Sequence, residues 1–350
     1  MLETEKILQA KISSRIIRRE VKHNEKIDKL LSEICLAFKV EKPKLLFCDT
    51  LTRRISSFEY RKIQYIIFDN SLFEFLFLFD KLLLSNAIIA DIDKLYYKIL
   101  YEECLFQNVT LALSCYQKYK SQLFSFDSLY DDEANVYIAC QTNFLLLHEV
   151  VHFDIAKNKN RDDYLNFKKM AFQCFFHLAN KYSCGSYIKE GLFEHFGLNI
   201  DIAKDELEYS FVFKKLEPFL EECFCDFKAF EYICKTYNKH SVLVSSSYSL
   251  LHFLINSEMI RNSFSSHAIT LNASVDKPFF ASYLRMHLFT LIVYFSKLDI
   301  EEKLLENCQK IDSRYAVVLE DVNNLPKIAI NGALKAMLIK MSHEYILGDD

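Results

Sequence analysis

The sequence predicts a predominantly helical α+β fold, and three observations lead to this prediction. Only 5 Gly and 4 Pro occur among 350 residues, so few residues interrupt regular structure. Long stretches have a helical pattern, among them residues 94–120 and 131–157. Short runs rich in aromatic and branched side chains, which indicate strands, occur at 45–50 and 62–69. We therefore expect a small β-sheet that precedes a long helix at 131–157.

The N-terminal elements follow from their local residues. Residues 3–40 have the pattern of one or two amphipathic helices, and Pro43 should end the helical stretch. The two predicted strands flank the segment "LTRRISSFEYR", which is polar and is predicted to be turn-like. The helical pattern returns from Ser71 onward.

The C-terminal half should be helical with one main interruption. Gly185, Gly191 and Gly197 fall in one short segment, which we expect to carry loops. Pro218 lies where a first-turn proline would open the next helix. We divide the chain into an N-terminal helical segment, a central domain that carries the motifs described below, and a C-terminal helical segment packed on that domain: residues 1–42, 43–260 and 261–350.

Composition excludes several classes of protein. Hydrophobic residues make up 51% and charged residues 26%, which is a globular balance, and a net charge of -4 gives no reason to expect nucleic acid as a partner. The two most apolar stretches are interrupted by Asp80 and Lys81 in one and by Arg285 and His287 in the other, so we expect no membrane span. The 11 cysteines follow no disulfide framework, and the N-terminus resembles no secretory signal. These features favour a cytoplasmic protein with reduced thiols. Its oligomeric state is not indicated.

The segment "HEVVH" is the strongest chemical signal in the chain. His148 and His152 are one helical turn apart, so their imidazoles project from one face and can bind one cation. Glu149 lies beside them, where its carboxylate can contact a water without being a ligand. This is the H-E-x-x-H arrangement of zinc hydrolases. The alternative, two histidines satisfied within a core, is disfavoured because burying them with a carboxylate is costly.

A catalytic zinc site needs a third protein ligand. Metzincins would have a glycine and a histidine at the positions of Ile155 and Asn158, so that class does not fit. The segment "EECFCDFKA" offers a glutamate from a second helix instead. Glu222 can bind the metal while Asp226, one turn later, orients a histidine, most plausibly His148. Two other carboxylates stay open as alternatives, Glu221 and Glu194. The neighbouring C-x-C of Cys223 and Cys225 has no second pair at finger spacing, and we interpret both as buried thiols.

These two motifs resemble those of the gluzincin metallopeptidases. His148-Glu-Val-Val-His152 followed by Glu222-x-x-x-Asp226-x-x-Ala229 is similar to the motif pair of HtpX and the prenyl-protein-processing proteases. The segment from Pro43 also resembles the strand–turn–strand that precedes the active helix of that group. The membrane helices of the group are missing here. The chain therefore resembles a soluble relative, such as a bacterial phage-exclusion protease of the Lit type or another stress or defence protease, and a general housekeeping enzyme stays open as an equal alternative.

The resemblance implies a zincin-like fold and a zinc-dependent peptidase acting on a protein or peptide substrate. Zn²⁺ would be held by His148, His152 and Glu222, and Glu149 would be the general base for a metal-activated water. The edge strand of the small sheet would bind substrate in extended form.

The residue that stabilises the oxyanion is unknown. Four side chains are candidates by type and position: Tyr237, His240, His267 and Arg285. Two other functions stay open: a regulatory or inactive helical binding protein whose zinc site is structural, and a zinc hydrolase of a non-peptide substrate.

Overall fold

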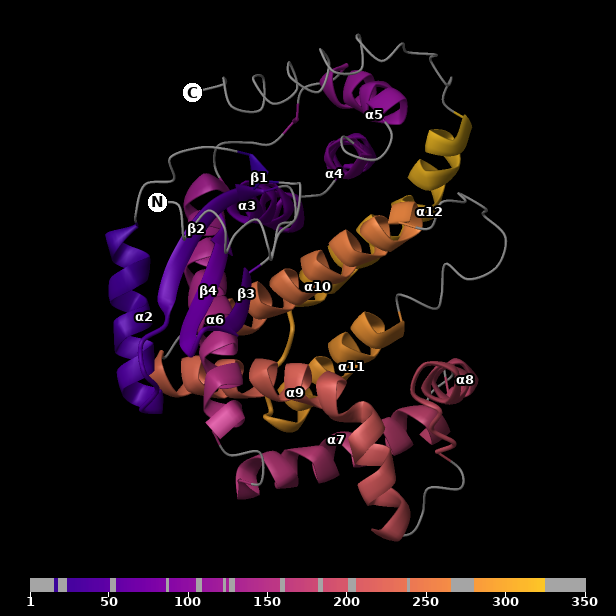
Figure 1. The fold of residues 1–350 in the computed structure, drawn as a ribbon. Coiled ribbons are helices and arrows are strands. Elements are labelled where there is room, and N and C mark those ends of the chain that lie inside the picture. The colour runs from indigo at the N-terminus through magenta and orange to yellow at the C-terminus, as the bar shows by residue number, and fades with distance from the viewer. Residues whose placement is uncertain are drawn as a thin grey trace.

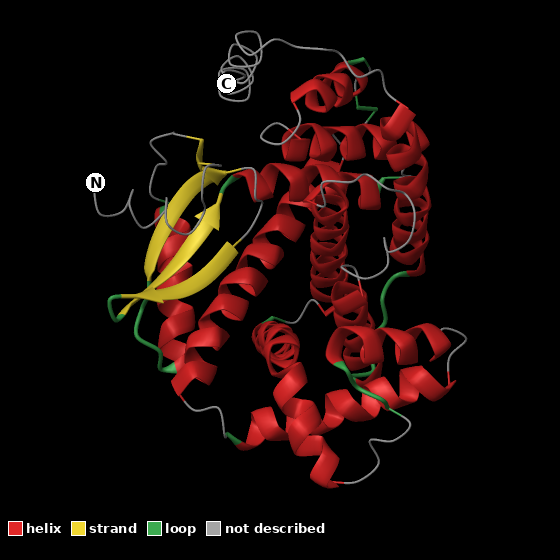
Figure 2. Cartoon of the chain, turned by 45° about the vertical axis from the view of Figure 1, so that its right-hand side comes forward, coloured by secondary structure: helices red, strands yellow, loops and turns green. Residues whose placement is uncertain are grey.

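The structure is a computed structural model, and it describes about three quarters of the chain. The described residues are 16–17, 24–50, 55–85, 88–104, 109–121, 124–125, 130–157, 161–181, 185–200, 206–237, 240–265 and 280–324. Helices dominate, and one small sheet lies at one side of them, as Figures 1 and 2 show. The prediction of a mainly helical α+β protein is confirmed at this level.

The sheet has the strand order β1-β2-β4-β3. Its strands are β1 (Ile16–Ile17), β2 (Lys44–Thr50), β3 (Ile55–Tyr60) and β4 (Ile63–Asp69). β2 and β4 are parallel, whereas β3 is antiparallel to β4. β4 is thus an inner strand, and β3 is the edge strand on the side that faces α6.

One described helix, α2 (Glu25–Phe38), lies between β1 and β2 in the chain. The others follow β4 and are α3 (Ser71–Leu84), α4 (Ile89–Cys104), α5 (Val109–Lys120), α6 (Asp131–Lys157), α7 (Asp162–Lys181), α8 (Gly185–Phe196), α9 (Glu206–Thr236), α10 (His240–Ser265), α11 (Phe280–Phe295) and α12 (Glu302–Asn324).

The predicted helix at 131–157 is confirmed residue for residue as α6. Acidic side chains occupy its first turn and Lys157 its last, which suits the helix dipole. Between these ends nearly every side chain from Gln141 to Val151 is buried, so α6 is a central core helix. It packs against α9, α10, α3 and α2, and against β3. The side chains of its middle turns are therefore held on all sides.

The prediction of a turn-like segment at 51–61 was wrong for the residues that the structure describes, and residues 51–54 lie outside them. Residues 55–60 form the edge strand β3, which joins β4 through a tight hairpin. Arg61 and Lys62 make this hairpin with positive φ angles of 51° and 64°. Because neither is Gly or Asn, the sequence does not carry the usual hairpin signal.

Two helix boundaries also differ from the prediction. The single helix expected at 94–120 is two helices, α4 and α5, which pack against each other, and residues 105–108 between them lie outside the described part. Helical periodicity continues through both and does not reveal that they are separate. Of the helical segment expected at 3–40, the structure describes α2 as helix and residues 16–17 as strand; residues 1–15 and 18–23 lie outside the described part.

The glycine-bearing segment is a helix rather than a set of loops. Gly185 and Gly191 both lie within α8, and only Gly197, with a φ of 63°, follows its end. A Cβ atom at Gly191 would lie 2.2 Å from the ring of Phe280 on α11, so this glycine permits close packing of the two helices. Pro218 likewise does not open a helix but lies inside α9, between the buried Leu216 and Leu220.

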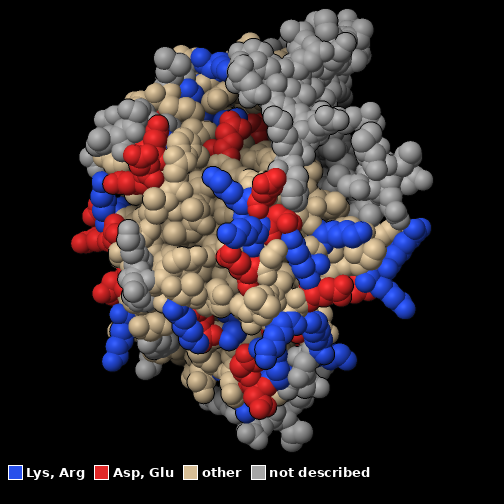
Figure 3. Space-filling view, turned by 90° about the vertical axis from the view of Figure 1, so that its left-hand side faces the viewer, with Lys and Arg blue, Asp and Glu red and all other residues tan. Residues whose placement is uncertain are grey.

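The proposed segment boundaries at 42/43 and 260/261 stay a prediction. α11 and α12, from the expected C-terminal segment, pack on helices of the middle one: α11 on α9 and α10, and α12 on α3 and α4. No described helix combines the length and apolarity needed to cross a membrane. On the side of α2 and the sheet, acidic and basic side chains are interspersed around uncharged areas (Figure 3).

A buried carboxyl ties α6 to two other core helices. Asp80 on α3 is fully buried, and its Oδ1 accepts hydrogen bonds from Gln141 Nε2 on α6, at 3.0 Å, and from Ser249 Oγ on α10, at 2.5 Å. Burial raises the pKa of Asp80 to about 8, although these two hydrogen bonds act in the opposite direction.

This carboxyl should make stability depend on pH. The folded-state pKa is raised above the unfolded value, so the contribution is complete at low pH and is lost as pH rises toward 8. We expect the free energy of unfolding to fall from pH 5 to 7 by up to about 1.4 kcal/mol per pH unit more than in Asp80→Asn. Urea unfolding of both proteins across this range measures the difference. Parallel pH profiles would contradict it.

Candidate metal centre

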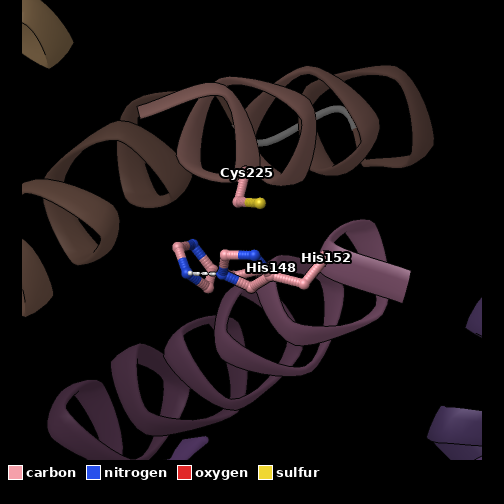
Figure 4. A group of neighbouring side chains, drawn as sticks. All are labelled: His148, His152 and Cys225. Carbon is pink, nitrogen blue, oxygen red and sulfur yellow. Dashed lines mark hydrogen bonds between the residues drawn. The ribbon is translucent and has the colours of Figure 1, made fainter. Parts of the chain in front are cut away.

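The facing surfaces of α6 and α9 bring the predicted site residues together. His148 and Glu149 on α6 are 5% and 6% exposed, and Asp226 on α9 is 2% exposed. Figure 4 shows the two imidazoles of α6 directed toward α9. Glu222 comes from α9 one turn before Asp226, and its side chain is 43% exposed, so the centre is reachable from one side.

The Nε2 atoms of both histidines and the carboxylate of Glu222 lie close together. His148 Nε2 is 3.2 Å from His152 Nε2, and each oxygen of Glu222 contacts one nitrogen: Oε2 lies 3.3 Å from His148 Nε2, and Oε1 lies 3.3 Å from His152 Nε2. Zinc–nitrogen bonds of about 2.0–2.1 Å in tetrahedral geometry would separate two ligand atoms by about 3.3 Å. The two nitrogens therefore already have the spacing of two corners of a tetrahedral zinc site, and the Glu222 carboxylate lies beside both.

The second ring nitrogens explain why the first ones face each other. Asp226 Oδ1 lies 2.9 Å from His148 Nδ1, and Glu221 Oε1 lies 3.1 Å from His152 Nδ1. Carboxylates only accept, so each Nδ1 donates its hydrogen, and in a neutral ring this leaves Nε2 with a lone pair. Two such lone pairs at this separation repel unless a proton or a metal cation lies between them. The arrangement thus favours a cation, and Asp226 has the orienting role predicted for it.

The electrostatics of the pocket are consistent with that conclusion. Burial alone would lower the pKa of His148, but hydrogen bonds to Asp226 and Glu222 outweigh it and raise the pKa above its usual value. The pKa of His152 is also raised. Burial alone would lower it, but hydrogen bonds with Cys225, Glu221 and Glu222 outweigh this effect. A group of carboxylates that favours protons on both imidazoles also favours a metal cation in their place.

The alternative third ligands have other positions. Glu221 contacts the outer nitrogen of His152 and so orients it, as Asp226 orients His148. Glu194 lies on α8, which packs on α7 and α11 rather than on α6. Among the carboxylates considered, Glu222 alone lies beside both Nε2 atoms.

Arg285 on α11 is part of the centre. Its guanidinium makes a two-pronged ion pair with Asp226, including a 2.8 Å bond from Nη2 to Oδ1, and Nη1 lies 3.3 Å from Glu222 Oε2. Although burial would raise the pKa of Asp226, Arg285 holds it below its usual range. Arg285 thus keeps Asp226 charged and limits the freedom of Glu222. Because its donors are used in this way, Arg285 is a positioning residue in this arrangement.

The other oxyanion candidates do not enter the described centre. Tyr237 is 44% exposed, and its hydroxyl oxygen accepts a hydrogen bond from Asn143 at 3.2 Å. It lines neither cavity described below. The side chain of His240 and the whole of His267 lie outside the described residues.

Cys225 lies closer to the centre than the sequence interpretation allowed. It was interpreted as an ordinary buried thiol, but donor atoms of His148, His152 and Cys225 lie within 4.8 Å of one another and could hold a metal ion. Figure 4 shows the sulfur facing the imidazoles from α9. Burial raises the pKa of this thiol to about 12, so it is protonated without a metal. The sequence did contain a signal for this position, because Cys225 follows Glu222 by three residues and so lies one turn further along α9.

Two cavities meet at the centre. One, of about 440 Å³, is lined by residues of β3, α3, α6, α9, α10 and α11, and the other, of about 420 Å³, by residues of β3, β4, α6 and α9. Ile55, Glu149 and Glu222 line both. Glu149 thus lies at the junction of two spaces on either side of the donor atoms.

Comparisons with protein-family models, with curated proteins and with solved structures found no match for this chain. The chemistry of the centre therefore has to be argued from its geometry.

Cobalt can report which atoms of this centre are ligands. We expect the Co²⁺-loaded protein to lack a thiolate charge-transfer band, because the Glu222 carboxylate already lies beside both Nε2 atoms and Cys225 would have to lose a strongly held proton. Absorption spectra of wild type, Cys225→Ser and Cys223→Ser check this. A band that disappears in Cys225→Ser and persists in Cys223→Ser would instead show four protein ligands.

Proposed function

We propose that this protein is a zinc-dependent peptide hydrolase with a zincin-like fold. The observation that carries the proposal is that the Nε2 atoms of His148 and His152 and the carboxylate of Glu222 face one another, while carboxylates hold the outer nitrogens of both histidines. A merely structural pair of core histidines would not need Nε2 atoms that face each other. The order of a strand hairpin, the helix α6 and a later helix α9 agrees with the gluzincin resemblance of the motifs.

His148, His152 and Glu222 would hold the ion, with Asp226, Glu221 and Arg285 around them. When bound, zinc supplies Lewis-acid chemistry that acidifies water and polarises a carbonyl. Two imidazoles and a carboxylate are a donor set that zinc accepts in hydrolases.

Glu149 is the general base in this proposal. It follows His148 directly on α6, is 6% exposed and lines both cavities. From there its carboxylate takes a proton from the attacking water and passes it to the leaving amine. Because the Glu149 side chain is nearly buried, its electrostatic contacts are screened less than they would be in bulk water.

The position of the edge strand β3 favours a polypeptide as the substrate. Residues 55–59 of β3 line the 420 Å³ cavity together with Glu149 and His152, and β3 pairs with β4 along one edge. An extended peptide can add to the other edge by main-chain hydrogen bonds, which would place its backbone beside Glu149. The strand predicted at 62–69 corresponds to the inner strand β4, so the edge that would bind such a peptide is that of β3, along residues 55–59.

The setting we propose is the cytoplasm. The described cysteines are free, and most of them are buried, which suits a reducing compartment.

A structural metal site is the second candidate function, and Cys225 is the observation that favours it. Four protein donors would close the coordination sphere and leave no position for water, as in structural zinc sites. Against it, Glu222 is 43% exposed and two cavities reach the centre, whereas closed sites are shielded.

Glu149→Gln separates catalysis from metal binding. We expect about one zinc per chain in wild type and in the variant, with proteolysis of an unfolded protein substrate only in wild type, because Gln cannot accept the proton. Metal analysis and a cleavage assay measure the two properties, with Glu133→Gln in the exposed first turn of α6 as the matched control. Zinc that is absent from wild type and is not restored by reconstitution would contradict the proposal, as would full activity in Glu149→Gln.

A further inference from the structure

The 420 Å³ cavity along the edge strand β3 has an acidic wall. No lysine or arginine is among the described residues that line it, whereas the 440 Å³ cavity is lined by an arginine. Besides His152, the ionisable groups of its wall are the carboxylates of Glu59, Glu149, Glu221 and Glu222. A cavity whose walls carry one sign of charge attracts groups of the opposite sign. This cavity therefore favours a cation over a neutral or acidic group.

A bound zinc ion would not neutralise this wall. Zn²⁺ carries two positive charges, whereas four carboxylates line the cavity, and histidines bind a metal in their neutral form. The guanidinium of Arg285 does not compensate for the remainder, because its two-pronged ion pair with Asp226 balances its charge. The cavity thus keeps a net negative charge when the metal is present.

Two of the four carboxylates have no partner of their own. Glu149 is 6% exposed and Glu59 is exposed, and neither side chain makes a hydrogen bond or an ion pair with a described residue. Burying an ionised carboxylate without a partner is costly, so the buried Glu149 favours positive charge in the cavity. In the proposed reaction Glu149 acts on the attacking water. Glu59 is then the carboxylate that stays open to a group of the substrate.

The register of β3 places the side chain of Glu59 on the helix-facing side of the sheet. Glu59 shares one face of β3 with Ser57 and Ile55, because side chains alternate along a strand. Ile66, which lies opposite Ser57 on β4, is fully buried in the core that also contains residues of α6. Directly opposite residues share a face of the sheet. Glu59 therefore projects toward the cavity.

The main chain of the same residues is directed toward the open edge. Tyr60 and Ile63 close the two-residue hairpin turn and form a hydrogen-bonded pair, and such pairs occur at every second position of an antiparallel ladder. The N–H and C=O groups of Ile55, Ser57 and Glu59 therefore point away from β4, at the edge of the described sheet. An extended peptide that pairs with these groups runs past the side chain of Glu59.

We propose that this cavity binds the positively charged side chain of a lysine or arginine residue in a peptide substrate, with the carboxylate of Glu59 as its ion-pair partner. The ammonium or guanidinium group donates hydrogen bonds to Glu59, and the other carboxylates of the wall add to the attraction. The assignment of this cation to a peptide rests on the proposed function, whereas the preference of the cavity for positive charge does not.

The length of β3 sets the distance between this cation and the reacting bond. Ile55 lines both cavities together with Glu149, so it lies beside the reacting groups. Glu59 lies four residues further along the strand, which is roughly 14 Å at about 3.4 Å per residue. A peptide extended along β3 should therefore carry its basic residue about four residues from the bond that is cut.

Binding of peptides that are not cleaved tests the charge preference. The probes are decapeptides of one neutral sequence, blocked at both ends, in which a single Lys, Gln or Glu occupies each position in turn. Calorimetry on the zinc-treated full chain carrying Glu149→Gln measures their dissociation constants. We expect the best Lys peptide to bind about twofold to fivefold more tightly than its Gln counterpart, which is the typical effect of one partly exposed ion pair. The Glu counterpart should bind more weakly still.

Substitution of Glu59 in the same background assigns the preference to one side chain. The advantage of Lys should be lost in Glu59→Gln, and the Glu peptide should bind best in Glu59→Lys. Glu41→Gln is the matched control, because Glu41 is an exposed residue just before β2 and lines neither cavity. Since salt screens ion pairs, the advantage of Lys should also shrink as the salt concentration rises, and this measurement needs no variant of Glu59.

Three outcomes overturn the proposal. The first is equal binding of the Lys and Gln peptides, or no binding of either. The second is an advantage of Lys that survives in Glu59→Gln or does not respond to salt. The third is a peptide without lysine whose unblocked N-terminus makes it bind as tightly as the Lys peptide, because the cation would then be a terminal amine rather than a side chain.

A peptide library measures the same preference during cleavage by wild type. Lys and Arg should be enriched at one position about four residues from the cleaved bond, and this enrichment should be lost in Glu59→Gln. Absence of all cleavage would count against the proposed function alone, since the binding measurements do not require catalysis. Cleavage without enrichment of a basic residue would overturn the assignment of this cavity.

Discussion

The centre depends on the contacts of the Asp226 carboxylate with the imidazole of His148 and the guanidinium of Arg285. This carboxylate is nearly fully buried, and it bonds at the same time to His148 on α6 and to Arg285 on α11. It therefore joins three helices at one point. A buried carboxylate is stable only where such partners surround it, so the three helices have to meet in this arrangement. The orientation of the His148 ring follows from that meeting.

The centre combines groups that burial alone would disfavour. Burial disfavours the charged forms of the imidazoles and of the carboxylates. The charges and hydrogen bonds among these groups outweigh burial, so the pKa of His148 is raised and the pKa values of Glu222 and Asp226 are lowered. Removal of one member would leave its partners buried and unpaired, which costs more than the pair contributes. Such a network is maintained at a cost in stability, which is typical of sites that serve chemistry rather than folding.

The sequence carried the part of the centre that depends on local spacing. The pairs His148/His152 and Glu222/Asp226 are each one helical turn apart, and helical geometry alone places each pair on one face. The long apolar run predicted α6 correctly for the same reason. Contacts between separate elements could not be predicted from local spacing. Arg285 lies 59 residues from Asp226, and nothing local to either residue indicates their ion pair. The edge position of β3 and the packing of Gly191 on Phe280 depend on neighbours distant in sequence in the same way.

The central claim is that α6 and α9 together hold one metal ion, and diffraction at the zinc absorption edge tests it most directly. Crystals of the zinc-treated protein should show one strong anomalous peak in contact with His148, His152 and Glu222. A map without a peak between these three residues would contradict the account, and so would a peak whose ligands exclude Glu222.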